Sequence, residues 1–164
     1  MDVYVRQVVP EDLDAVTRVE AVCFPEAEAA ARDSFSQRIS VFPESFFVAE
    51  QDGRIIGFIN GAVTDRRTIA DEMFEDAGLH QPDGAYQSIF GLDVLPEFQH
   101  QGIASLLMRH LIADARQKGR AGLILTCKDR LIGFYEQFGY RNLGVSQSVH
   151  GGAVWYDMIL EFEA

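Results

Sequence analysis

The segment Leu92–Ser105 constrains the fold more than any other part of the sequence. Within it the hydrophobic pattern changes from that of a strand to that of a helix. An apolar stretch ends at Pro96, a polar turn follows, and a helix pattern begins at Gly102. The first turn of a helix leaves backbone N–H groups without partners, and the aligned peptide dipoles add partial positive charge. Small residues at Gly102 and Ala104 let a ligand approach the backbone closely. The segment predicts an anion site of the kind that holds a pyrophosphate, although an ordinary strand-to-helix turn has the same pattern.

The residues of this turn are similar to a family signature. Gln99-x-x-Gly102-x-Ala104 resembles the acyl-CoA-binding signature Arg/Gln-x-x-Gly-x-Gly/Ala of the GCN5-related N-acetyltransferase (GNAT) superfamily. The preceding range 92–96 reads Leu-x-Val-x-Pro and resembles that family's fourth strand. Further along, the range 134–140 reads Phe-Tyr-x-x-Phe-Gly-Tyr and resembles the superfamily's second signature, at the expected distance from the first. Two separate signatures in the family's order argue against a chance match.

Three other stretches resemble one branch of the superfamily, the arylalkylamine (serotonin) N-acetyltransferases and their microbial relatives. They are the ranges 24–30, 53–61 and 129–135, so the resemblance runs over nearly the whole chain. It implies a single N-acetyltransferase domain over residues 1–164 with the GNAT fold. This is an α/β (α+β) fold in which helices flank a mixed, mostly antiparallel central sheet of six to seven strands, whose fourth and fifth strands splay apart.

Hydrophobic periodicity and turn residues predict the same order of elements. Asp52-Gly53 predicts a tight hairpin turn between two apolar strands. The strands are expected over 4–9, 46–51, 54–59, 86–94, 121–127, 140–146 and 154–162. The helices are expected over 10–23, 26–39, 69–75, 102–118 and 131–138. An unrelated α/β sandwich with this order of elements remains an alternative.

Charge and composition exclude several classes of protein. A net charge of −11 argues against nucleic-acid binding, which needs a basic surface, and suits a cationic acceptor. No run approaches the roughly 20 apolar residues that span a membrane. Met1–Arg6 lacks the pattern of a secretory signal, so a cytoplasmic location is expected. Cys23, Cys127 and the four histidines show no metal-ligand spacing, so we expect reduced thiols and no metal.

The resemblance implies that the chain binds acetyl-CoA as a co-substrate. Because the fourth and fifth strands of the family splay apart, the backbone of Leu92 and Val94 is expected to pair with the pantetheine arm. An N–H near Val94 is expected to donate to the thioester carbonyl, and the main chain of 100–105 to hold the pyrophosphate. The Gln99 side chain either donates to a phosphate oxygen or lies solvated in the loop. The expected cofactor-binding residues are Leu92, Asp93, Val94, Gln99, His100, Gln101, Gly102, Ile103, Ala104 and Ser105.

Two residues are candidates for the chemistry. Tyr135 stands where the family places the general acid that protonates the CoA sulfur; the alternative is a packed tyrosine with its hydroxyl at the surface. Animal serotonin acetyltransferases carry two histidines in the fourth strand, where this chain has Ser88 and Phe90. Phe90 cannot titrate, and Ser88 either anchors a water in a proton relay or faces a neighbouring strand. The base stays unassigned, with Asp93, Glu28 and solvent all open.

The acceptor pocket is expected around the loop after the first helix, at Phe24 and Pro25, with Phe42 and Pro43 as weaker candidates. By base rate, most of the twelve phenylalanines serve the core. The resemblance implies an enzyme that transfers an acetyl group to the primary amine of a small molecule, an arylalkylamine or a polyamine, in a ternary complex. The alternatives are acetylation of a protein N-terminus or lysine, and a non-catalytic acyl-CoA sensor. Exposed strand edges permit a homodimer without specifying one.

Overall fold

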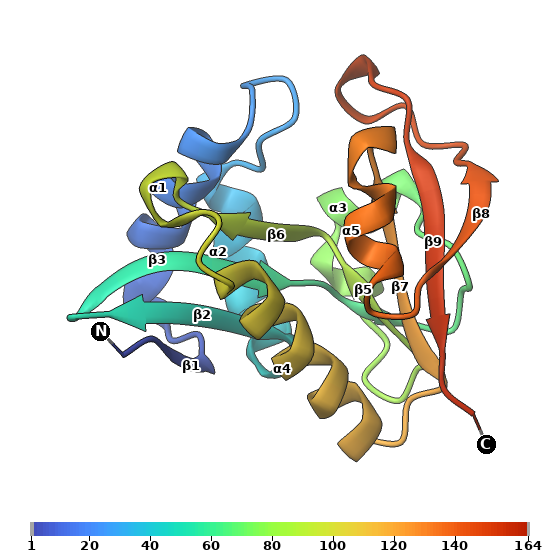
Figure 1. Cartoon of the computed structure of the whole chain (residues 1–164), viewed down its shortest axis with the longest axis horizontal. Coiled ribbons are helices and arrows are strands. Elements are labelled where there is room, and N and C mark those ends of the chain that lie inside the picture. Colours follow the sequence, from blue (N-terminus) through green and yellow to red (C-terminus); the bar gives the residue numbers. More distant parts are fainter. Residues whose placement is uncertain (1, 164) are drawn as a thin grey trace.

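Two β-sheets and five α-helices make up residues 2–163, which this computed structural model describes (Figure 1). The four-stranded sheet has the order β1-β2-β3-β6, and the five-stranded sheet has the order β4-β5-β7-β9-β8. The strands are β1 (Tyr4–Gln7), β2 (Phe46–Gln51), β3 (Arg54–Asn60), β4 (Val63–Thr64), β5 (Tyr86–Ile89), β6 (Gly91–Val94), β7 (Gly122–Cys127), β8 (Arg141–Val145) and β9 (Tyr156–Glu161). The helices are α1 (Leu13–Cys23), α2 (Arg32–Val41), α3 (Asp71–Glu75), α4 (Ile103–Gln117) and α5 (Ile132–Glu136). None of these helices is long and apolar enough to cross a membrane.

Helices cover both faces of the four-stranded sheet, because successive strand residues point to opposite sides. Phe46 and Phe58 pack on one side against Phe35 of α2, with ring centroids 6.2 and 5.5 Å away. Phe47 points to the other side, where its ring centroid lies 4.5 Å from that of His110 of α4. The sheet therefore lies between α2 and α4.

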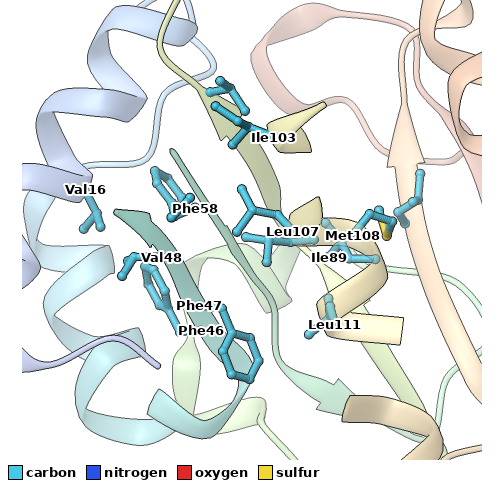
Figure 2. Packing of buried hydrophobic residues seen from close by; sticks show 14 of the residues in the cluster. Val16, Phe46, Phe47, Val48, Phe58, Ile89, Ile103, Leu107, Met108 and Leu111 are labelled. Carbon is cyan, nitrogen blue, oxygen red and sulfur yellow. The ribbon is translucent and has the colours of Figure 1, made fainter. Parts of the chain in front are cut away.

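Helix α4 joins the two sheets into one core. Its buried residues recur at helical spacing and form a single apolar face. They are Ile103, Leu107, Met108, Leu111 and Ala115. Figure 2 shows part of this face beside Phe58 of the four-stranded sheet and Ile89 of the five-stranded sheet. Both sheets thus share one hydrophobic core that spans the strand break described below.

The expected order of elements is present, with local differences. The hairpin turn is confirmed, since Asp52 and Gly53 have φ angles of 52° and 77°, as a type I′ turn requires. The second helix begins at Arg32, later than expected, because the backbone N–H of Ala30 is held by the Glu20 carboxylate, at 2.8 Å, and does not enter a helix. The short strand β4 is buried and lies just before the polar region 65–84, outside the expected strands.

The expected strand 86–94 is interrupted at Phe90, and this break divides the sheet in two. Before it, β5 pairs with β7 in parallel as far as Ile89 and Leu125. After it, β6 pairs with β3 in antiparallel fashion and forms the edge of the four-stranded sheet. The chain thus changes partners at Phe90, and β6 and β7 diverge there. This divergence is the expected splay between two strands.

Candidate active site

The turn before α4 presents backbone N–H groups to an open end. His100 and Gly102 both adopt the left-handed conformation, with φ angles of 64° and 81°. The N–H of Leu106 makes the first bond within the helix, to the Gly102 carbonyl at 3.0 Å. The preceding N–H groups of 103–105 therefore lie at the helix end without intrahelical acceptors. A Cβ added to Gly102 would meet no heavy atom within 4 Å, so the space before this turn is free for an anion.

The open edge of β6 presents main-chain groups to the gap between the diverging strands. The Leu95 N–H donates to the Ile56 carbonyl of β3 at 2.9 Å, so the main chain of Leu95 points toward β3. In a strand the main-chain groups of every second residue point to the same side. By this alternation the main-chain groups of Leu92 and Val94 point away from β3, toward the gap. The main chain of Asp93 points toward β3.

The Val94 carbonyl and the Gln99 side chain bind each other. The Gln99 amide Nε2 donates to this carbonyl at 3.0 Å, and the Cys23 thiol donates to it at 3.3 Å. The Gln99 side chain is thus folded back onto the strand and buttresses the turn. Of the main-chain groups of Val94, the N–H faces the gap and the carbonyl is already engaged.

A cavity of about 260 Å³ opens where β6 and β7 diverge, with walls from α1, α2, α3, α5 and both strands. Five aromatic residues line it: Phe24, Phe74, Phe90, Tyr135 and Trp155. Four charged residues and one histidine line it as well: Glu20, Glu28, Arg38, Glu75 and His150. The Phe74 ring packs on Phe90 at 4.7 Å and stacks on His150 at 5.6 Å, so the aromatic groups form a continuous wall. Such a cavity can hold an organic cation.

Tyr135 of α5 stands in the cavity wall and is 8% exposed. Its ring packs edge-on against Phe134 and Tyr140, with centroids 5.2 and 5.9 Å away, which fixes its orientation. Burial, followed by the charges of Cys127 and Asp93, raises the pKa of Tyr135 above its ordinary value. The phenol therefore carries its proton at neutral pH, as a proton donor must, but the raised pKa makes it a weaker acid than an ordinary tyrosine.

The other sequence candidates lie in different places. Phe24 lines the cavity, whereas Pro25 is not among the lining residues. Ser88 is fully buried and its hydroxyl donates to the Ala62 carbonyl at 2.6 Å, so the structure does not bring it into the cavity. Phe42 is also fully buried and packs behind Phe90, with ring centroids 6.2 Å apart.

The charged groups of the cavity depend on contacts between distant segments, and among them the sequence pointed only to Glu28, as one open candidate for the base. Glu28 forms an ion pair with Lys128, 100 residues later, at 2.9 Å. Arg38 is 4% exposed and donates to Asn60 Oδ1 at 3.2 Å. Glu20 lines the cavity from the buried face of α1, where the sequence shows only a helical residue. Within the described chain, no group of three His, Cys, Asp or Glu side chains could hold a metal ion.

Comparisons with known proteins agree with this geometry. The model of the "Acetyltransferase (GNAT) family" matches residues 13–140. Serotonin N-acetyltransferase of Mesocricetus auratus is 28% identical over 143 residues, which cover 85% of this chain and 68% of that protein. The solved structure of the GphF GNAT-like decarboxylase with isobutyryl-CoA is similar with a TM-score of 0.82 and 24% identity, over 96% of this chain and 98% of that one. The PaiA N-acetyltransferase of Thermoplasma acidophilum with coenzyme A gives a TM-score of 0.74 and 16% identity, over 99% and 100% of the two chains. The expected fold is confirmed, and the chain belongs to the acetyltransferase (GNAT) family.

Proposed function

We propose that this acetyl-CoA-dependent N-acetyltransferase acts on the primary amine of a small aromatic alkylamine. The observation that carries the proposal is the cavity, which combines an aromatic wall with carboxylates beside the strand break. Carboxylates and aromatic faces both attract an ammonium group, and the rings accept an aryl group. The cavity volume of about 260 Å³ lies just below the roughly 300–1,000 Å³ range of ligand pockets, which favours a small acceptor.

The acceptor side of the cavity is bridged by contacts between loops, which also favours a small molecule over a peptide. The His150 ring Nε2 lies 2.8 Å from the Glu28 carbonyl, which can only accept, so this nitrogen donates. The Ser148 hydroxyl and the Val149 N–H bind the Asp71 carboxylate of α3, the latter at 3.1 Å. These contacts tie the β8–β9 loop to both neighbouring walls. A peptide acceptor would need this loop to open.

The residues at the donor side fit acetyl-CoA. The main chain of Leu92 and the N–H of Val94 would hold the pantetheine arm along the open edge of β6. The Val94 N–H would also donate to the thioester carbonyl. The N–H groups of 103–105 would hold the pyrophosphate, supported by the open space before Gly102. Acetyl-CoA supplies the activated acetyl group as a thioester.

In the proposed reaction, the chain orients both substrates for direct attack of the amine on the thioester. Tyr135 donates its phenol proton to the sulfur as the carbon–sulfur bond breaks, which yields the free thiol. Cys127 also lines the cavity, but burial, followed by the Asp129 charge, raises the pKa of its thiol to about 11. A neutral thiol is a poor nucleophile, which supports direct transfer without an acetylated enzyme.

An acceptor panel tests the proposal. Thiol release from acetyl-CoA would be measured with phenethylamine, tryptamine, spermidine and a peptide with a free N-terminus, and the product confirmed by its mass. We expect the highest kcat/KM with the aromatic amines. Activity on the peptide alone would contradict the small-amine proposal and favour a protein acetyltransferase. Tight acetyl-CoA binding without release under any acceptor would favour a sensor.

A further inference from the structure

Two buried carboxyl groups, Glu20 of α1 and Asp93 of β6, lie beside the cavity and have no role in the steps above. Glu20 is 7% exposed and lines the cavity, whereas Asp93 is 1% exposed and lies behind it. Glu20 Oε2 accepts the N–H of Ala30 at 2.8 Å. Its other oxygen and both oxygens of Asp93 are buried without a hydrogen-bond partner among the described residues. Because buried polar atoms are nearly always paired, these three oxygens require an explanation.

The two carboxyl groups converge at Gly91, where the chain has no side chain to separate them. A Cβ added to Gly91 would stand 3.2 Å from Asp93 Oδ1 and 3.7 Å from Glu20 Oε1. Two carboxyl groups this close and this dry cannot both ionise. Burial, followed by the charge of Glu20, raises the pKa of Asp93 well above its ordinary value. The pair therefore keeps one shared proton and one negative charge at neutral pH.

The surrounding groups balance this single negative charge. Arg38 of α2 is the cation that faces the pair, and it is oriented by its bonds to Asn60 Oδ1 at 3.2 Å and to the Phe74 carbonyl at 3.0 Å. Burial lowers the pKa of Arg38 to about 10, so the guanidinium stays charged at neutral pH. The other titratable groups that face the pair are a thiol and a phenol. Burial raises the pKa of each, so both are neutral at neutral pH.

Those neutral groups are the Cys23 thiol of α1 and the Tyr135 phenol of α5. Burial raises the pKa of Cys23 to about 12. One arginine and one negative charge on the pair thus leave the polar centre neutral overall. For this balance the pair must hold one proton. Its remaining carboxylate can then accept a second.

We propose that Glu20, sharing a proton with Asp93, is the base that takes the proton of the acceptor ammonium. The N–H bond of the ammonium breaks, its electron pair stays on nitrogen, and the proton moves to a Glu20 carboxyl oxygen. The pair then holds two protons, and the neutral amine attacks the thioester carbon. The pair returns the extra proton to solvent after the product leaves. Glu20 is the catalytic residue, and Asp93 is a positioning residue that holds the Glu20 carboxylate in place through the shared proton.

This inference rests on the proposed function only in the choice of acceptor, so the test compares two amines with the same ring. Phenethylamine is an ammonium ion at neutral pH, whereas 2,2-difluoro-2-phenylethylamine is far less basic and is largely neutral. Glu20→Gln should lower kcat roughly 100-fold or more with phenethylamine, the range of general-base catalysis, and far less with the fluorinated amine. An equal loss with both amines would overturn the proposal. Glu72→Gln, at an exposed position of α3, is the control and should behave as wild type.

Asp93→Asn separates a positioning role from a structural one. The proton that Asp93 shares stabilises the negative charge on the pair, and an Asn amide donates more weakly, so the acid limb of the kcat–pH profile should move to higher pH. An unchanged limb with reduced kcat would mean that Asp93 is only structural and would overturn the shared-proton account. The infrared band of a protonated carboxyl at neutral pH should be present in the wild type and absent from Asp93→Asn. This band needs no acceptor, so its absence from the wild type overturns the inference even if neither amine is a substrate. A wild type that acetylates neither amine but shows the band contradicts the proposed function alone.

Discussion

Replacing Gly102 by alanine should weaken acetyl-CoA binding far more than it weakens the fold. The φ angle of 81° places Gly102 in the left-handed region, which costs an L-residue roughly 1–2 kcal/mol. The added methyl would meet no heavy atom within 4 Å, so this strain is the whole cost to folding. It corresponds to a fall in Tm of roughly 2–8 °C for a chain of this size. The methyl would, however, stand before the N–H groups that we assign to the pyrophosphate. Losing one hydrogen bond to a charged group costs about 1.5–3 kcal/mol, so the Kd for acetyl-CoA should rise roughly 10- to 100-fold.

Gly119 provides a matched control at the other end of the same helix. Its φ angle is 76°, and a Cβ there would also meet no heavy atom within 4 Å. Gly119→Ala should therefore lower Tm as much as Gly102→Ala, as measured by calorimetry, and leave the Kd for acetyl-CoA unchanged in a titration. Equal affinity of the two variants for acetyl-CoA would refute the assignment of the turn before α4.

Three other predictions concern the chemistry, the buried acid and the core. Tyr135→Phe should lower kcat roughly 100-fold or more with little change in Tm or in the Kd for acetyl-CoA; full turnover would remove this phenol from the reaction. Because the pKa of Asp93 is raised in the folded state, its contribution to stability is present below the ordinary Asp pKa of about 4 and is lost as pH rises through the folded-state value. In urea unfolding the wild type should thus lose more stability than Asp93→Asn as pH rises from about 4 to that value, and a parallel pH dependence would contradict the raised pKa. Leu107→Ala removes a fully buried side chain that packs between the sheets and should cost about 2–5 kcal/mol in urea unfolding; a loss within error of zero would contradict the shared core.

The elements that local chemistry determines could be predicted from the sequence. The Asp52-Gly53 turn and the glycine before α4 both require a left-handed backbone, and both are where the residues predict them. The apolar spacing of α4 gave its bounds to within one residue. The second helix begins later than predicted, because the alanine-rich stretch 26–31 favours a helix by composition alone. Its backbone is instead held by Glu20, a contact that no local pattern reveals.

The donor side of the candidate site could be predicted from the sequence, whereas most of the acceptor side could not. The donor side lies in one continuous segment, 92–105, so its signature and its geometry are both local. The acceptor side is assembled from α1, α2, α3, α5 and the β8–β9 loop, through contacts such as Glu28 with Lys128. Ser88 matches the position of a histidine in the animal serotonin acetyltransferases, but the direction of its side chain depends on the partner strand, and its hydroxyl faces the Ala62 carbonyl. Glu20 gave no signal because its burial depends on the packing of α1 against β6.

Two-substrate initial-rate kinetics with phenethylamine and acetyl-CoA, read together with product and protein masses, test the central claim most directly. Direct transfer in a ternary complex predicts intersecting reciprocal plots, an amine heavier by one acetyl group, and a protein of unchanged mass. Parallel plots with an acetyl group on the protein, or release of CoA without an acetylated amine, would contradict the account.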